Sequence, residues 1–293
     1  MPSLDDLKKR ITSVKSTQKI TKAMKMVAAA KLKKAQDNAE KGRPYSEKMK
    51  NIILNLTNSI SDPENAPKLL VGTGLDKTHL CVVMTADKGL CGGFNSNICK
   101  LAKNYFEKIL KEEKNLKIIT VGTKGLDQLK RKYGKYIIKK ISFKEKKKIS
   151  FTEAEEVGKI VIDLFERKDF DKCILFYNNF KNVITQIPQA QQIVPAEKIK
   201  EDKLKIKEDN FYEFEPDEDE ILEDLLPKNI STQIYRAFLE NAASEQGSRM
   251  TAMDNATRNA GDLVDNLTIK YNRSRQASIT KELIEIISGA ESL

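Results

Sequence analysis

The strongest constraint on the fold is the scarcity of helix-breaking residues near the N-terminus. No Gly or Pro occurs between Pro2 and Gly42. Selected side chains recur at alternating steps of three and four, which places them on one stripe of a helix. The stripe contains Leu4, Leu7, Ile11, Val14, Gln18, Thr21, Lys25, Ala28, Leu32 and Ala35. This spacing predicts a long helix that ends or kinks near Gly42 and Pro44 and then resumes to Ser59.

The C-terminal part of the chain has the same character. Between Pro227 and Ser288 no further Pro occurs, and only Gly247 and Gly261 interrupt the helical pattern. The middle of this stretch is rich in small side chains, which allow two helices to approach closely. The last turns are apolar at Ile279, Leu283, Ile286 and Ile287. We therefore expect a second long helix over 216–293.

Helices of this length cannot bury an apolar stripe without a partner. The economical arrangement is an antiparallel pair in which the helix over 1–60 lies along the helix over 216–293. The alternative is that each helix packs on a core of its own. The acidic run Asp217–Glu220 suits a helix N-terminus, where the helix dipole favours negative charge, better than a metal site.

The middle of the chain alternates between strand and helix patterns. We expect strands at His79–Thr85, Leu116–Gly122, Tyr136–Phe143 and Lys172–Tyr177, and a fifth extended stretch within Asn182–Val194. Helical patterns separate the first four, and Thr152 with Glu155 has the spacing of a capping box. This alternation is typical of a small, open and mostly parallel α/β sheet over about 70–215. The charged segment Ala196–Glu220 is expected to be a loop or a short ribbon.

Charge is distributed unevenly over the chain, which carries 52 Lys and Arg against 42 Asp and Glu. Residues 1–50 hold 14 basic and 5 acidic side chains, whereas residues 216–293 hold 8 basic and 14 acidic ones. A basic arm that binds nucleic acid is one interpretation of the first segment. The regular apolar spacing argues against it, because a solvated arm needs no such spacing. No stretch is apolar enough to predict a transmembrane helix.

The glycine-rich turn after the first expected strand invites an enzymatic interpretation. Gly89, Gly92 and Gly93 lie between a strand and a helix, a context that can hold phosphate at a helix N-terminus. Their spacing matches neither a dinucleotide fingerprint nor a P-loop. We therefore favour a tight packing turn, with a nucleotide-dependent oxidoreductase as the alternative. His79 is the one histidine and has no evident catalytic neighbour in the sequence, so no catalytic residue is assigned.

The cysteines give no sign of a metal or redox site. Cys81, Cys91, Cys99 and Cys173 form no CxxC pair, and one histidine does not complete a zinc site with them. Buried thiols in a reducing compartment are the simpler interpretation. We expect neither a metal nor a cofactor.

Three motifs carry a resemblance to the gamma subunits of rotary F-type ATP synthases. They are Ile11–Leu32 (ITSVKSTQKITKAMKMVAAAKL), Asp87–Asn95 (DKGLCGGFN) and Ala243–Leu293. They occur in the order found in that family, whereas about 135–225 matches only loosely. The resemblance implies a fold with a long antiparallel coiled coil of the N- and C-terminal helices plus a Rossmann-like open α/β domain.

The same resemblance implies a function and a set of partners. The chain would be a non-catalytic central shaft that couples transmembrane proton flow to ATP synthesis or hydrolysis by rotation. Its partners would be the alpha and beta subunits of the catalytic ring, the epsilon subunit and the membrane c-ring, with no nucleic acid. The expected location is the cytoplasmic face of a bacterial inner membrane, with the matrix face of the mitochondrial inner membrane as the alternative.

Individual contact residues follow from the matching motifs. Phe214 and Glu215 match a segment that contacts the rotor ring, although some family members carry Tyr at the first position, which puts a hydroxyl contact there in doubt. The alternative for every carried-over position is a solvated or intrahelical side chain. The positions that match contacts of the shaft with beta are Met24, Lys25, Arg249, Arg275, Gln276, Thr280, Glu282 and Glu285.

Overall fold

The computed structural model describes residues 3–59, 67–146, 149–195 and 218–291. Phe214, Glu215 and most of the expected loop Ala196–Glu220 lie outside this part of the chain. The described chain forms two compact units. We call Met1–Ala30 with Arg249–Leu293 the terminal unit and Lys31–Ser248 the sheet unit. Two helices, α1 (Leu4–Ser59) and α6 (Glu218–Glu291), belong to both units.

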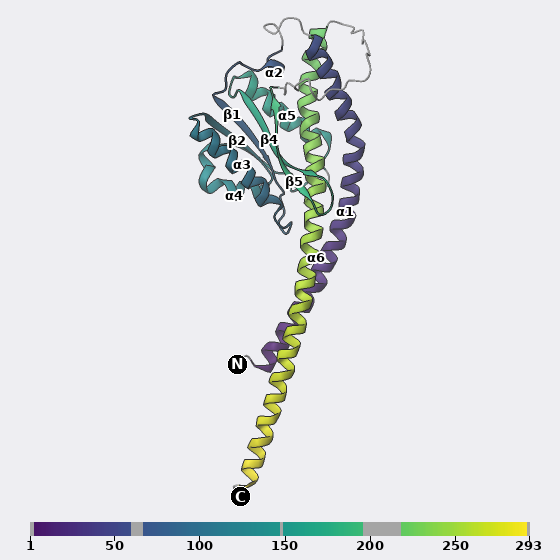
Figure 1. Cartoon of the computed structure of the whole chain (residues 1–293), viewed down its shortest axis with the longest axis vertical. Helices are drawn as coiled ribbons and strands as arrows, with labels where there is room; N and C mark the ends of the chain where they lie inside the picture. The colour runs from purple at the N-terminus through teal and green to yellow at the C-terminus, as the bar shows by residue number, and fades with distance from the viewer. Residues whose placement is uncertain (1–2, 60–66, 147–148, 196–217, 292–293) are drawn as a thin grey trace. The chain divides into compact units, whose positions relative to one another are not determined.

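In the terminal unit, α1 and α6 run side by side in opposite directions (Figure 1). Lys25 bonds to Asp254, and Thr257 donates to the hydroxyl of Thr21 at 2.8 Å. Further toward the start of α1, a Cβ on Gly261 would lie 3.1 Å from the amide nitrogen of Gln18, which explains a small residue there. From Lys25 to Gln18 the residue numbers fall along α1, while those of their partners in α6 rise from 254 to 261. The two helices therefore form an antiparallel coiled coil, as expected.

The burial of α1 confirms the heptad register predicted from the sequence. Every predicted stripe position from Leu4 to Ala35 is buried or partly buried, and Ala28 is 1% exposed. The neighbouring apolar side chains Ile20 and Val27 are instead more than half exposed. The stripe therefore packs within the chain, and the apolar residues beside it face outward.

Pro44 does not interrupt α1, so the helix does not end there, which was one of our two alternatives. One helix runs from Leu4 to Ser59 with Pro44 inside it, and α6 likewise contains Pro227. Proline removes only one backbone donor. In the sheet unit, packing of α1 on α6 offsets that loss: Met49 and Ile53 are buried with Leu222 and Leu226.

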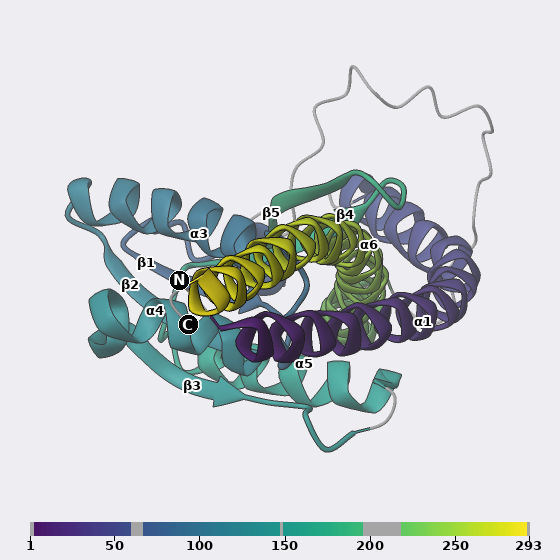
Figure 2. The ribbon, with the colours of Figure 1, turned by 90° about the horizontal axis from the view of Figure 1, so that it is seen from below.

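The sheet unit holds five strands in the order β3-β2-β1-β4-β5, with β3 at one edge and β5 at the other (Figure 2). All neighbouring pairs are parallel except β4 with β5, which are antiparallel. A mostly parallel open sheet is therefore confirmed. The strands are β1 (Thr78–Met84), β2 (Asn115–Val121), β3 (Ile137–Ile141), β4 (Lys172–Phe180) and β5 (Gln186–Val194).

Helices cover both faces of this sheet (Figure 1). On one face α3 (Phe94–Lys111) and α4 (Thr123–Tyr133) enclose a core centred on Phe106 and Phe176. On the other face α5 (Phe151–Glu166) and the Ile230–Phe238 part of α6 enclose a core around Leu175. The sheet is thus buried on both sides, which explains its continuous apolar strands.

The remaining short elements are α2 (Lys68–Val71) and the 3₁₀ turn η1 (Gly134–Tyr136). The start of α5 differs from the predicted capping box at Thr152. Ser150 is the N-cap, and its backbone N–H donates to Glu153 at 2.7 Å. The four cysteines are buried thiols. Within the described chain, no helix is both long and apolar enough to cross a bilayer.

Candidate functional site

All of the predicted contact positions for beta lie in the terminal unit. Met24, Lys25 and Arg249 are partly buried on the paired part of the helices. The positions beyond them along α6 are exposed: Arg275, Gln276, Thr280, Glu282 and Glu285. The structure therefore divides the predicted contacts into a partly buried group and an exposed group.

Lys25 is engaged within the coiled coil. Its ammonium lies 2.6 Å from Asp254, whose carboxylate also bonds to Arg258. The hydrogen bond from Lys25, followed by that from Arg258, lowers the pKa of Asp254 below its usual value. The charge of Lys25 is therefore balanced inside the chain, which the sequence did not predict because the two residues are 229 positions apart.

Beyond Leu267, α6 has no buried residue through position 290. This stretch still carries large apolar side chains on its surface. Ile286 is 67% exposed and Ile269 is 66% exposed, and Ile279, Leu283, Ile284 and Ile287 are each about half exposed or more. An exposed apolar surface of this extent is typical of a site that contacts another protein or a membrane.

Some polar residues of this stretch have partners on the same helix. The hydroxyl of Thr280 donates to the carbonyl of Gln276 at 2.9 Å, and Ser278 donates to Glu282 at 3.3 Å. Lys281 lies 3.5 Å from Glu285. Exposed helical pairs of this kind stabilise by only a few tenths of a kcal/mol, roughly. They are therefore easily exchanged for contacts with a partner.

The glycine-rich turn between β1 and α3 is held by packing and hydrogen bonds. The backbone N–H of Ala86 donates to Asn95 at 2.9 Å, and the hydroxyl of Ser248 donates to the carbonyl of Cys91 at 2.7 Å. The next turn, after β2, is also tight: Gly122 has φ +96°, and a Cβ there would lie 2.2 Å from the carbonyl oxygen of Thr85.

The position at which an open α/β sheet binds a nucleotide is filled by α6. The sheet order reverses between β1 and β4, and ligands usually bind at the carboxyl ends of such strands. There Asn241 accepts from the backbone N–H of Asn178 at 3.1 Å and donates to the carbonyl of Met84 at 3.5 Å. Ser244 donates to the carbonyl of Asn178 at 3.2 Å. These bonds fix α6 against the carboxyl ends of β1 and β4.

Asp87 joins the carboxyl ends of three strands. Its carboxylate accepts from the backbone N–H of Thr123 at 2.9 Å, from the hydroxyl of Ser142 at 2.8 Å and from the backbone N–H of Phe143 at 3.2 Å. An acidic residue beside a glycine-rich turn can indicate chemistry. Here its oxygens are occupied by the chain itself, so Asp87 is a structural residue.

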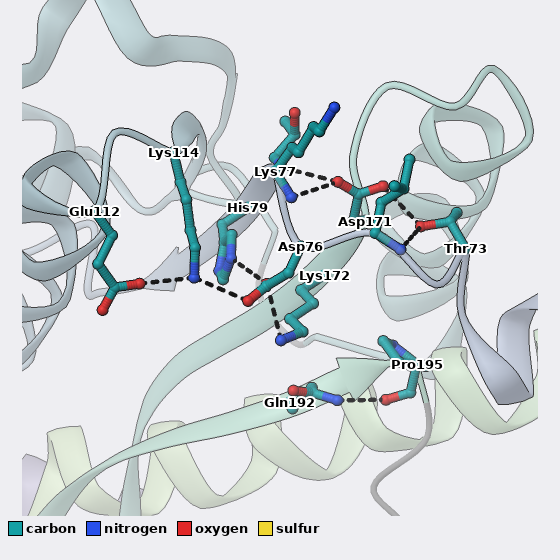
Figure 3. Close-up of polar contacts among 12 residues, drawn as sticks. Thr73, Asp76, Lys77, His79, Glu112, Lys114, Asp171, Lys172, Gln192 and Pro195 are labelled. Atoms are coloured by element: carbon teal, nitrogen blue, oxygen red, sulfur yellow. Dashed lines mark hydrogen bonds and ion pairs between the residues drawn. The ribbon is translucent and has the colours of Figure 1, made fainter.

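A charged cluster lies at the opposite, amino ends of the parallel strands (Figure 3). Asp76 accepts from Lys114, Lys172 and the Nε2 of His79, each at 2.8 Å. Lys114 also bonds to Glu112 at 2.7 Å. The cluster ties the loop before β1 to the starts of β2 and β4.

A second carboxylate in Figure 3 fixes the same loop through its backbone. Asp171 accepts from the hydroxyl of Thr73 at 2.7 Å and from the backbone N–H groups of Lys77 and Thr78, both at 2.9 Å. Neither carboxylate was predicted as important, because its partners come from distant segments.

Burial and hydrogen bonding set the protonation of this cluster. Burial alone would raise the pKa of Asp76, but hydrogen bonds from Lys114 and Lys172 outweigh it and lower the pKa well below its usual value. Burial lowers the pKa of His79, although Asp76 opposes this effect. A neutral His79 therefore donates from Nε2 to Asp76 and accepts at Nδ1 from Tyr105, at 2.9 Å. Across the described ranges, no group of three or more His, Cys, Asp or Glu side chains is placed to hold a metal ion.

Comparisons with known proteins cover the whole chain. A family model described as ATP synthase matches residues 3–293. The ATP synthase gamma chain of Pelagibacter ubique (strain HTCC1062) is 73% identical over 293 residues, which are 100% of both chains. The ATP synthase gamma chain of Rhizobium etli (strain CIAT 652) is 55% identical over 296 residues, again with 100% of each chain covered.

Solved structures agree with this assignment. The central stalk and c-ring structure of Tetrahymena thermophila mitochondrial ATP synthase contains a chain that is 28% identical, with a TM-score of 0.62, covering 81% of this chain and 99% of that one. A chain of Euglena gracilis mitochondrial ATP synthase covers 99% of this chain and 94% of its own length, with a TM-score of 0.66, and at 20% identity shares the fold. The resemblance noted in the sequence is confirmed: this chain belongs to the ATP synthase gamma-chain family.

Proposed function

We propose that this gamma chain acts as a non-catalytic shaft whose terminal unit turns within the alpha and beta subunits. Gamma is the central rotor-shaft subunit of ATP synthase and couples proton flow across the membrane to ATP synthesis or hydrolysis by rotation. The observation that carries the proposal is the stretch 268–290 of α6. It is helical and apolar on its surface, yet buries no residue within its own chain.

The exposed apolar side chains of this stretch suit a bearing within a ring of apolar partner side chains. Polar residues between them, Arg275, Gln276, Thr280, Glu282 and Glu285, would make hydrogen bonds with beta that break at each step. Met24 and Arg249 would contact beta from the paired part of the shaft. Lys25 would contribute through its pair with Asp254 and so help to orient that surface.

Coupling requires that one side of the shaft favours one state of a catalytic subunit. A partner changes a conformational equilibrium only when it binds the two states with different free energies. Side chains that differ around the helix supply this asymmetry. In contrast to a deep apolar anchor, mixed polar and apolar contacts allow the shaft to move on after each step.

The non-catalytic role is supported by the filled position at the carboxyl ends of β1 and β4. Asn241 and Ser244 of α6 bond to the backbone at the ends of these strands, so α6 packs where a nucleotide would otherwise lie. The glycine-rich turn therefore serves packing in this proposal. Membership of the gamma-chain family also supports this role over the oxidoreductase and nucleic-acid hypotheses.

The remaining partners are the epsilon subunit and the membrane c-ring. Phe214 and Glu215 are the proposed contacts with the c-ring loops. The proposed location is peripheral, at the cytoplasmic face of a bacterial inner membrane, and similarity to the gamma chains of Pelagibacter ubique and Rhizobium etli supports it.

Removal of residues 279–293 tests the proposal. Since residues 279–290 are all exposed, the truncated chain should keep its folding stability within about 0.5 kcal/mol, as for surface changes. It should still co-purify with alpha, beta, epsilon and c subunits, but membrane vesicles should hydrolyse ATP without efficient proton pumping. Full pumping by the truncated complex would refute the proposed role of this stretch. Tight stoichiometric nucleotide binding by the isolated full chain in equilibrium dialysis would refute the non-catalytic role.

A further inference from the structure

One face of α6 is polar and yet covered within the sheet unit. Glu240, Asn241, Ser244 and Ser248 follow the spacing i, i+1, i+4 and i+8, which places them on one side of a helix. The first three are 3%, 7% and 0% exposed, and Ser248 is partly buried. We call these four residues the polar seam. Covered helix faces are usually apolar, because a buried polar group costs free energy unless it is hydrogen-bonded.

Two residues of the polar seam bond to the ends of neighbouring strands. Asn241 accepts from the backbone N–H of Asn178 on β4 at 3.1 Å and donates to the carbonyl of Met84, the last residue of β1, at 3.5 Å. Ser244 donates to the carbonyl of the same Asn178 at 3.2 Å. Side chains from successive turns of α6 therefore bond to both backbone polar groups of one strand residue.

The other two residues connect the polar seam to further parts of the sheet unit. Glu240 accepts from the backbone N–H of Phe180, the last residue of β4, at 3.1 Å and from Arg43 of α1 at 3.2 Å. Ser248 donates to the carbonyl of Cys91 in the glycine-rich turn at 2.7 Å. One face of α6 is thus hydrogen-bonded to α1, to the ends of β1 and β4, and to the turn that leads into α3.

Hydrogen bonds and apolar contacts respond differently when a helix turns about its own axis. Apolar contact is non-directional, so it fixes the angle of a helix less specifically. A hydrogen bond weakens steeply once its angle falls below about 120°. A shift by one residue turns an α-helix by roughly 100°, which would leave the buried groups of the polar seam without partners at a high cost in free energy. The polar seam therefore fixes one angle of α6 against the sheet.

We propose that the polar seam transmits torque between α6 and the sheet unit, because it prevents the helix from turning relative to the sheet. This inference rests on the proposed function, in which the terminal unit turns within alpha and beta. Torque on α6 reaches the rest of the chain through the contacts of the helix, and the polar seam supplies directional contacts up to Ser248, where the sheet unit ends. The four residues are thus positioning residues for coupling, and this role accounts for polar side chains on a covered helix face.

The dependence of coupling on load tests the proposal in the assembled enzyme. Protons pumped per ATP hydrolysed are measured on the same membrane vesicles, first without and then against a large proton gradient. The double variant Ser244→Ala with Ser248→Ala removes two hydroxyl groups of the polar seam and leaves its packing nearly unchanged. Its ratio should be close to that of the unmodified enzyme without a gradient and should fall about threefold or more against the gradient, because the weakened seam then lets α6 turn without the sheet unit.

Thr232→Val is the matched control, since it also removes a buried hydroxyl from α6, but one that donates to Lys228 within the same helix. It should keep the normal ratio under both conditions.

A second pair of variants at the partly buried Ser248 applies if the double variant does not assemble. Ser248→Ala should lower the ratio against the gradient, whereas Ser248→Thr keeps the hydroxyl and should preserve it. Equal ratios against the gradient for the seam variants and Thr232→Val would overturn this inference and leave the proposed function intact. An unmodified enzyme that hydrolyses ATP without pumping protons would instead refute the proposed function, and this inference with it.

Discussion

Gly122 is the residue at which the sheet unit leaves least room for change. Its φ of +96° lies in a region that favours glycine, and a Cβ would overlap the carbonyl oxygen of Thr85. The close approach brings the turn after β2 against the end of β1. The same contact lets Thr85 accept from the backbone N–H of Gly125 at 2.8 Å.

Gly122→Ala should therefore destabilise the sheet unit by about 3 kcal/mol or more, because strain and overlap combine. Gly134→Ala is the matched control, since its Cβ meets nothing within 4 Å and its φ is −54°. The control should change stability by less than about 1 kcal/mol. Urea unfolding followed by tyrosine fluorescence measures both, since Tyr271 is the one tyrosine outside Lys31–Ser248. Equal midpoints for the two variants would contradict this account.

His79 gives the sheet unit a specific dependence on pH. Burial lowers its pKa in the folded chain below the ordinary value of 6.5. The unfolded chain therefore binds a proton at a higher pH than the folded chain does, so stability is lost as pH falls below about 6.5. The groups facing His79 are Asp76, Tyr105, Lys114 and Lys172. The low pKa of Asp76 adds a further loss of stability at lower pH.

His79→Gln should flatten the pH dependence of stability between pH 7 and pH 5, by at most about 1.4 kcal/mol per pH unit. The Gln amide can still donate to Asp76 but does not titrate, so the two chains differ in the protonation of residue 79 and not in this hydrogen bond. Urea unfolding at several pH values measures the slope. The chain has one histidine, which makes the assignment direct. A slope in the variant as steep as that of the unmodified chain would exclude His79 as the titrating group.

Among whole elements, α1 shows which features the sequence predicts and which features depend on distant parts of the chain. The heptad spacing predicted which face is buried, because that spacing is a local property of one helix. The alternative that α1 ends near Pro44 was wrong, because packing on α6 helps decide whether the helix continues. The cluster around Asp76 was missed for the same reason: its lysines lie 38 and 96 residues away along the chain, and only the sheet brings them together.

The buried face of α1 makes Leu7 a test of the coiled coil, since its side chain is 6% exposed. Leu7→Asp should reduce the yield of assembled complex severalfold, because an unpaired carboxylate in this seam costs several kcal/mol, roughly. Lys9→Asp places the same charge on the exposed face two residues later and should leave the yield nearly unchanged. Purification of tagged complexes and quantitation of gamma relative to beta measures this. A normal yield with Leu7→Asp would show that the seam register does not control assembly.

The molecule combines a sheet whose two faces are both covered by helices with the long helix α6, which has no buried residue from 268 to 290. A chain folded for its own stability would not leave Ile279, Leu283 and Ile286 exposed. Because of this difference between the sheet unit and the end of α6, we expect mutations in the two regions to affect folding and coupling separately. Substitutions in the sheet unit should change the stability of the fold, whereas substitutions of the exposed residues beyond Leu267 should change contacts that form only in the complex.

Gln276→Leu tests that separation in the assembled enzyme. Gln276 is exposed, and its side chain makes no hydrogen bond within the described chain, so folding and assembly should be unaffected. Loss of its proposed hydrogen bonds with beta should lower ATP-driven proton pumping severalfold relative to ATP hydrolysis, because each bond to a polar partner contributes about 0.5–1.5 kcal/mol to the coupled step. Asn272→Leu replaces another exposed amide on the same helix that matches no proposed contact, and should keep the ratio normal. Pumping and hydrolysis measured on the same vesicles distinguish the two variants, and an equal ratio in both would remove Gln276 from the coupling surface.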